Sequence, residues 1–322
     1  MCALLLIFSL TWQICETRAS LHLDCICCAD SFLGWKLNPM PAIQPARLKS
    51  QVDGLMSHFH APDAFIRELH LILDFYADRT RRPGLTGKPK PLIRSYNVPR
   101  QVLRSIETGL LALIEANPDD ALALADALWA DAWFESRRLA IDILGALPLS
   151  QADAVMERVQ GWGKPCKDED LTEMLLARGT ARLRTEAPDA FLQQIERWFT
   201  APDAATRRLG LRAIPGLAAN PKFENLPILY RLLTSLLRDA ESSLEGGLLR
   251  AVQALAQRSP QETAYFLQQI LQTPHQPGVE IIVRRSLGHF PAPLDEGDQG
   301  LILDVGGFDC RKGALAPHEK RR

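Results

Sequence analysis

Apolar residues recur at helical spacing along most of the chain, in segments of about three turns separated by short polar breaks. Alanine and leucine dominate these segments and runs of β-branched residues are scarce, so the pattern predicts helices and no sheet. Proline beside a polar residue marks several helix starts, as at Pro62-Asp63, Pro188-Asp189 and Ser259-Pro260. The expected helices span residues 48–56, 64–77, 100–116, 120–130, 135–145, 151–160, 171–184, 187–199, 204–217, 226–238, 243–257, 260–272 and 279–290.

A recurring segment gives these helices a period. Paired arginines open three of its copies, at Arg137-Arg138, Arg207-Arg208 and Arg284-Arg285. A fourth copy carries Gly247 at the matching position, so the intervals counted from Arg138 are 70, 39 and 38 residues. The first interval leaves room for a degenerate copy at residues 171–178. A period in the high thirties with two helices per unit is typical of HEAT repeats. The sequence therefore predicts an all-α fold, a HEAT-like α-solenoid whose antiparallel helix pairs form a right-handed superhelix.

Both ends of the chain depart from this repeat, which is expected to occupy residues 40–293. Residues 1–39 hold five of the seven cysteines and an apolar run, Ala3 to Trp12, that no lysine or arginine precedes. We interpret this extension as lying before a natural start at Met40, and a signal-like or a functional segment are the alternatives. Helical periodicity ends after Pro293, so residues 294–322 are expected to be a disordered tail.

Composition narrows the chemistry. The formal net charge is −1, which by itself does not require a nucleic-acid partner. The repeat region and tail carry only Cys166 and Cys310, which fits a reducing cytoplasm, and the N-terminal apolar run is too short to span a membrane. The histidines form no helical ligand pairs and no phosphate-binding loop or hydrolase motif occurs in the repeat region. We therefore expect a monomer with no metal and no cofactor.

The paired arginines allow two interpretations. Adjacent helix residues point about 100° apart, so only one arginine of each pair can face along the inner surface. In the first interpretation the arginines join neighbouring repeats through Glu135, Asp142 and Asp203. In the second they form a row of guanidinium groups along the concave surface. Arginine matches phosphate geometry well, so such a row would follow a nucleic-acid backbone.

The segment LWADAWFESRRLAIDILGAL, at residues 128–147, resembles the helix pair of bacterial AlkD-type DNA alkylation-repair proteins, which are HEAT-like glycosylases. The resemblance continues through residues 163–214 and into SSLEGGLLRAVQALAQRSPQETAYFL and RRSLGHFP, and so covers most of residues 40–291. It implies duplex DNA in the concave groove and excision of cationic alkylated purines. An Asp in a tryptophan-lined cleft would promote loss of the base, because a carboxylate stabilises positive charge developing at the sugar.

Carried over by position, the family's catalytic Asp falls at or near Glu173, and a shifted Asp170 is the alternative in the acidic stretch CKDEDLTEM. The DNA-contacting arginine falls at Arg208. The other candidate DNA-binding residues are Arg138, Arg250 and Arg285. The two cleft tryptophans of the family are matched by Glu169 and Arg250, so the aromatic cleft is lost or rebuilt. Trp162, nearby in sequence, is either a replacement ring or a packed inter-helix aromatic.

Two functions follow from these observations. The first is a DNA-binding HEAT-repeat protein of the alkylation-repair type, with weak or lost N-glycosylase activity on alkylated purines. The second is a scaffold without catalytic activity that binds a protein partner in its concave groove. Steep salt dependence of binding to duplex DNA separates them, because several phosphate contacts release several counterions.

Overall fold

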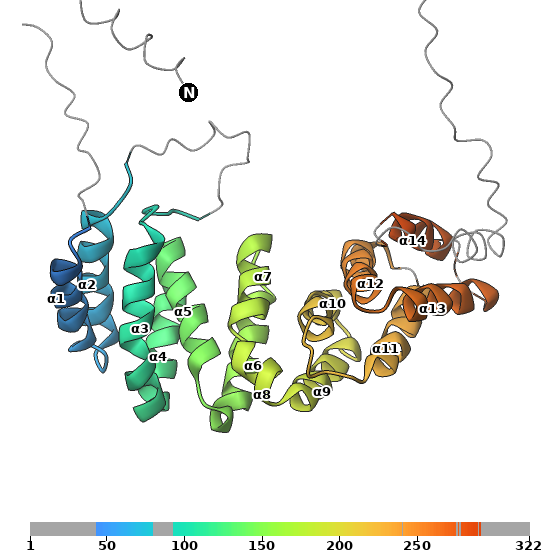
Figure 1. Ribbon diagram of the computed structural model, residues 1–322, viewed down its shortest axis with the longest axis horizontal. Coiled ribbons are helices and arrows are strands. Elements are labelled where there is room, and N and C mark those ends of the chain that lie inside the picture. Colours follow the sequence, from blue (N-terminus) through green and yellow to red (C-terminus); the bar gives the residue numbers. More distant parts are fainter. Residues whose placement is uncertain are drawn as a thin grey trace, which may run out of the picture. The chain divides into compact units, whose positions relative to one another are not determined.

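The computed structural model describes residues 43–79, 93–239, 241–274, 276, 278–288 and 290. The expectations for residues 1–39 and 294–322 lie outside the described residues. Every regular element within the described ranges is a helix, and the one strand-like feature there is an isolated bridge between Arg94 and Trp133. In chain order the helices are α1 (Pro45–Met56), α2 (Pro62–Phe75), α3 (Arg100–Ala116), α4 (Pro118–Ala130), α5 (Phe134–Ala146), η1 (Leu149–Gln151), α6 (Ala152–Gly163), α7 (Glu169–Arg178), α8 (Ala181–Glu186), α9 (Pro188–Phe199), α10 (Ala204–Ala218), α11 (Leu226–Asp239), η2 (Ser242–Leu244), α12 (Glu245–Arg258), α13 (Pro260–Gln272) and α14 (Gly278–Leu287) (Figure 1).

The helix starts show why the sequence pattern located them well. Proline occupies the first turn of α1, α2, α4, α9 and α13, where its missing N–H leaves no helical hydrogen bond unmade. Aspartate side chains cap two other helices. Asp168 Oδ1 accepts from Leu171 N at 3.0 Å at the start of α7, and Asp203 Oδ1 accepts from Thr206 N at 2.9 Å at the start of α10.

One expected helix is wrong. Residues 171–184 were predicted to form a single helix, but the structure has α7 and α8 with a break at Gly179 and Thr180. A Cβ atom on Gly179 would lie 2.6 Å from the Leu175 carbonyl oxygen, so only glycine allows the chain to turn back so closely there. The Thr180 hydroxyl donates to the Leu176 carbonyl at 2.6 Å and holds the break in place.

The helices pack in sequential pairs and alternate between two sets. Helices α1, α3, α5, α7, α10, α12 and α14 each pack on the next of this set, which we call the first row. The helices between them in sequence pack against this row, and α2 also packs on α4, and α11 on α13 (Figure 1). A continuous apolar core runs between the two sets. The copies of the repeat, including the degenerate one, are α5, α7, α10, α12 and α14. The all-α, HEAT-like class predicted from the period is confirmed.

No single helix in the described ranges is long and apolar enough to cross a membrane. Two consecutive helices bent by 111°, Phe134–Ala146 and Leu149–Gly163, are together long and apolar enough for a membrane span, by length and composition alone.

Candidate nucleic-acid interface

All six residues singled out from the sequence lie on the first row, which therefore carries the candidate site. Asp170 and Glu173 are on α7, Arg138 is on α5, Arg208 is on α10, Arg250 is on α12 and Arg285 is on α14. Their surroundings differ. Arg138, Arg250 and Arg285 are held by acids, whereas Arg208 is exposed and makes no hydrogen bond or ion pair with any described residue.

Ion pairs join helices of the first row to one another. Arg285 of α14 pairs with Glu245 of α12, and Arg250 of α12 pairs with Glu173 of α7 across α10. Arg212 Nη2 of α10 lies 2.7 Å from the Glu169 carboxylate of α7. These contacts fit the interpretation of the arginines as ties between repeats. Of the three acids expected to join the paired arginines to a neighbouring repeat, Asp142 meets Arg138 only within α5 and reaches the next repeat through Arg178 of α7, and Glu135 and Asp203 have other partners.

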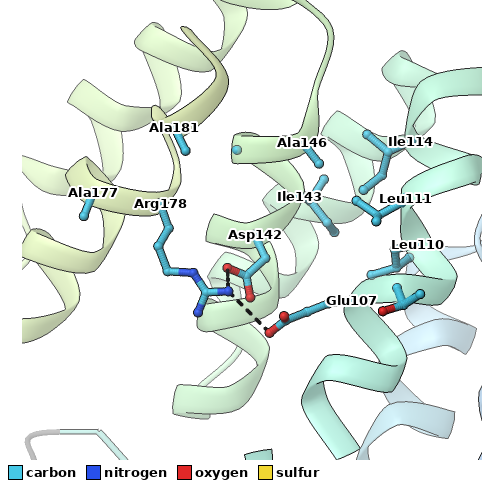
Figure 2. Close-up of a pocket in the computed structure, with 12 residues that line it drawn as sticks. Glu107, Leu110, Leu111, Ile114, Asp142, Ile143, Ala146, Ala177, Arg178 and Ala181 are labelled. Carbon is cyan, nitrogen blue, oxygen red and sulfur yellow. Dashed lines mark ion pairs between the residues drawn. The ribbon is translucent and has the colours of Figure 1, made fainter. Parts of the chain in front are cut away.

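Four ionisable side chains of α3, α5 and α7 form the most buried part of this network, namely Glu107, Arg138, Asp142 and Arg178. Figure 2 shows Glu107, Asp142 and Arg178. Arg138 Nη2 donates to Glu107 at 2.6 Å. Arg178 Nη2 lies 2.7 Å from Asp142 Oδ1 and 3.5 Å from Glu107 Oε1. The group sits at one end of a cavity of about 420 Å³ whose other walls are mostly apolar, including Leu111.

The two acids of this cluster differ in pKa. Burial, and next the interaction with Glu107, raise the pKa of Asp142 to about 8. Partial burial acts to raise the pKa of Glu107 too, but the interaction with Asp142 and the two guanidinium groups outweigh it and lower that pKa. Near neutral pH the cluster therefore contains two guanidinium cations, one carboxylate and one protonated carboxyl group.

Arg207 and Arg208 have different surroundings, as expected for adjacent helix residues that point about 100° apart. Arg207 Nη2 donates to Glu241 at 2.7 Å, and Arg207 Nη1 donates to the carbonyl oxygen of Ala201. Arg208 instead lines a cavity of about 330 Å³, the Arg208 cavity, whose wall also includes Lys167 and the glycines Gly246 and Gly247. A Cβ atom on Gly246 would meet nothing within 4 Å, so the approach to Arg208 is open on that side.

A second cavity, of about 320 Å³, lies over α10 between α7 and α12. Arg184 of α8 closes one end, and the Arg250–Glu173 pair lies in its wall. We call it the Arg184 cavity. It holds the position where the family resemblance places the catalytic acid. Glu173 is exposed, and its carboxylate forms an ion pair with Arg250. Asp170 is exposed in the first turn of α7 and makes no hydrogen bond or ion pair with a described residue.

Aromatic side chains are absent from the walls of both cavities in the described part of the chain. Trp162 stacks on Trp129 of α4, with ring centroids 4.6 Å apart and an interplanar angle of 6°. The structure thus places Trp162 as a packed inter-helix aromatic. Glu169 and Arg250, the residues that the resemblance matches to the family's tryptophans, contribute a carboxylate and a guanidinium group to these walls.

Sequence reasoning missed several residues of these sites, namely Glu107, Lys167, Arg178, Arg184 and Arg212. The repeat period was a signal for Arg178, because the degenerate copy ends on it. Glu107 and Arg184 gave no comparable signal, since both lie outside the recurring segment and their positions depend on packing between helices distant in sequence.

Comparison with known proteins identifies the family to which the chain belongs. Residues 75–285, well over half of the chain, match the model of the family described as DNA alkylation repair enzyme. The chain belongs to that family. A solved structure, that of smu.31 from Streptococcus mutans UA159, is similar with a TM-score of 0.46 and 13% identity. That match covers 59% of this chain and 98% of the streptococcal one. No curated protein matches the chain.

Proposed function

We propose that this protein binds duplex DNA along the first row and that Arg208 contacts a backbone phosphate. Family membership supports a DNA substrate, and the state of Arg208 is the observation that carries the proposal. Arg208 is the predicted DNA-binding arginine whose guanidinium is not held by a described acid. An exposed guanidinium beside an open cavity can form charge-assisted hydrogen bonds to phosphate oxygens.

The experiment is the affinity for a short duplex at fixed salt, measured for the parent and for Arg208→Ala. We expect the variant to bind about tenfold more weakly. Arg231→Ala is the matched control, because Arg231 is also exposed, at 72%, but belongs to α11, outside the first row. Equal affinities of the parent and Arg208→Ala would contradict the proposed contact. Absence of duplex binding by the parent would favour the protein scaffold.

We further propose that excision of cationic alkylated purines is weak or lost. Glu173 would have to stabilise positive charge at the sugar, but its carboxylate already pairs with Arg250. Arg184 adds a positive charge to the cavity that no described acid balances, which disfavours a cationic base. Asp170 remains the alternative acid because no described cation pairs with it.

Release of alkylated purine from treated duplex DNA tests this second proposal. We expect the parent to release base little faster than a protein-free control. Rapid release would overturn the proposed loss, and two variants would then assign the acid. Glu173→Gln would abolish release if Glu173 acts, and Asp170→Asn would abolish it if Asp170 acts. Release that survives both substitutions would rule out both residues.

A further inference from the structure

Arg184 is a half-buried cation whose charge no described acid balances. Its Nη2 donates to the Ala177 carbonyl at 2.9 Å, and no ion pair joins it to a carboxylate in the described ranges. Burial lowers the pKa of Arg184, and no neighbouring acid offsets this effect. Partly removing a guanidinium from water without a counter-ion is unfavourable, so the position favours an anion that arrives from outside.

The backbone around Arg184 leaves space for its guanidinium group and holds the end of α8 in place. A Cβ atom on Gly216 would overlap Arg184 Nη1, so the guanidinium occupies the space that any larger residue would fill. Asn220 Nδ2 donates to the Arg184 carbonyl at 2.7 Å and fixes the end of α8 against the end of α10. The cation is therefore held at the cavity rather than free to turn into solvent.

The charge count around the Arg184 cavity is positive. Three guanidinium groups line it, those of Arg184, Arg212 and Arg250. Two carboxylates balance two of them, Glu169 on Arg212 and Glu173 on Arg250. One positive charge is left, and it belongs to Arg184, which is half-buried.

The other residues that line the Arg184 cavity indicate which kind of anion would fit it. Gln253 and Gln257 contribute amide groups that can donate hydrogen bonds, while Leu176, Ala213 and Ala254 form an apolar side. Several planar donors suit a tetrahedral oxyanion with many acceptor atoms. A volume of about 320 Å³ exceeds that of phosphate alone, so an attached organic group would lie against the apolar side.

We propose that the Arg184 cavity binds a phosphate monoester, with the phosphate on the Arg184 guanidinium and the organic group against the apolar wall. Such a group is found at the end of a DNA strand and in a mononucleotide. The Arg184 and Arg208 cavities share Arg212 and Arg250 in their walls, but the two phosphate contacts are assigned to different arginines, so either proposal can fail without the other.

The test measures binding of inorganic phosphate and of a deoxynucleoside monophosphate to the parent by calorimetry. We expect both to bind saturably, with the monophosphate tighter. Arg184→Gln should weaken both by about tenfold or more, and Arg184→Lys should retain part of the affinity because it keeps the charge. Gly216→Ala should weaken binding as well, since its methyl group displaces the guanidinium. Arg231→Ala serves as the control that should bind phosphate like the parent, because Arg231 lies on α11 outside both cavities. Thermal melts check that every variant folds.

Duplexes with a 5′-phosphate or a 5′-hydroxyl end separate the two sources of the monoester. A 5′-phosphate that raises the affinity of the parent, but not of Arg184→Gln, assigns the site to a strand end. Equal affinity for both duplexes, together with tight mononucleotide binding, assigns it to a small molecule. The proposal is overturned if the parent binds none of these probes, or if Arg184→Gln or folded Gly216→Ala binds them as the parent does.

Discussion

Gly145 is a residue whose size sets the spacing between two helices of the first row. A Cβ atom at this position would overlap the Arg178 carbonyl oxygen at the end of α7, so the glycine allows α5 and α7 to approach closely. We expect Gly145→Ala to lower the free energy of unfolding by about 1–3 kcal/mol, because the backbone of α7 must move to make room. Urea denaturation measures this change.

A matched glycine provides the control for that measurement. Gly161 lies inside α6, and a Cβ atom there would meet nothing within 4 Å. Gly161→Ala should leave the free energy of unfolding unchanged or raise it by up to about 1 kcal/mol, because alanine favours the helix. Equal effects of the two substitutions would show that the close approach at Gly145 carries no cost.

Asp142 predicts a pH dependence of stability. Its pKa is raised to about 8 in the folded protein from an ordinary value of 3.8, chiefly by burial. Between these values the folded state keeps a proton that the unfolded state has released, so stability falls as pH rises through this window. The loss is at most about 1.4 kcal/mol per pH unit and is absent below the unfolded pKa.

Asp142→Asn should remove this dependence, because an amide of nearly the same shape does not titrate in this pH range. Relative to the parent, the variant should gain on the order of 1 kcal/mol for each pH unit between pH 6 and pH 8. Urea midpoints at these two pH values provide the measurement. A parent and variant that respond to pH in parallel would show that Asp142 does not hold its proton.

At the scale of the element, the first turn of α5 holds the segment that precedes α3. Glu135, which is 2% exposed, accepts hydrogen bonds from Ser95 Oγ at 2.7 Å, Tyr96 N at 3.1 Å and Asn97 N at 2.9 Å. Asn97 has a φ of 55°, a conformation that asparagine tolerates better than most residues. The carboxylate is therefore an acceptor for two backbone amides of this turn, and for Tyr96 N it is the side-chain acceptor that the structure shows.

We expect Glu135→Ala to destabilise the protein by about 2–4 kcal/mol, because Ser95 Oγ and Tyr96 N lose their acceptor and Asn97 N keeps only Ser95 Oγ. The amides of Tyr96 and Asn97 should also exchange with deuterium much faster than in the parent. Glu157→Ala is the control, since Glu157 is exposed on α6 and makes no described contact. Unchanged exchange at both amides would contradict the role assigned to Glu135.

Helix boundaries show what the sequence can predict and where it stops. Starts marked by proline or a capping aspartate, such as Pro188 and Asp203, were located within about two residues because the signal is local. The break at Gly179 was missed because the apolar pattern continues through it, and its cause is the tight turn between α7 and α8. The cavities were unpredictable for a related reason, since Arg184 meets Gly216 only after both helices pack.

For the whole molecule, the ion pairs on the first row contribute less to stability than their number suggests. Most join partly exposed side chains, for example Arg250 at 38% and Glu173 at 51% exposure. Exposed pairs are each worth about 0–1 kcal/mol and weaken further in salt. The apolar core between the two helix sets therefore carries the fold, and added salt should shift the melting temperature by only a few degrees, about 2–4 °C per kcal/mol lost.

Duplex binding should weaken with salt far more steeply than the stability of the fold does. Each phosphate contact adds about −0.9 to the slope of log affinity against log salt, because a condensed cation is released. With Arg208 as one contact, Arg208→Ala should make the slope shallower by about one while leaving the melting temperature as in the parent. Arg231→Ala should change neither quantity. Affinities measured from about 50 to 200 mM salt give the slopes. A slope unaltered by Arg208→Ala would place the phosphate contacts elsewhere on the molecule, and a flat response of the parent would remove duplex DNA as its partner.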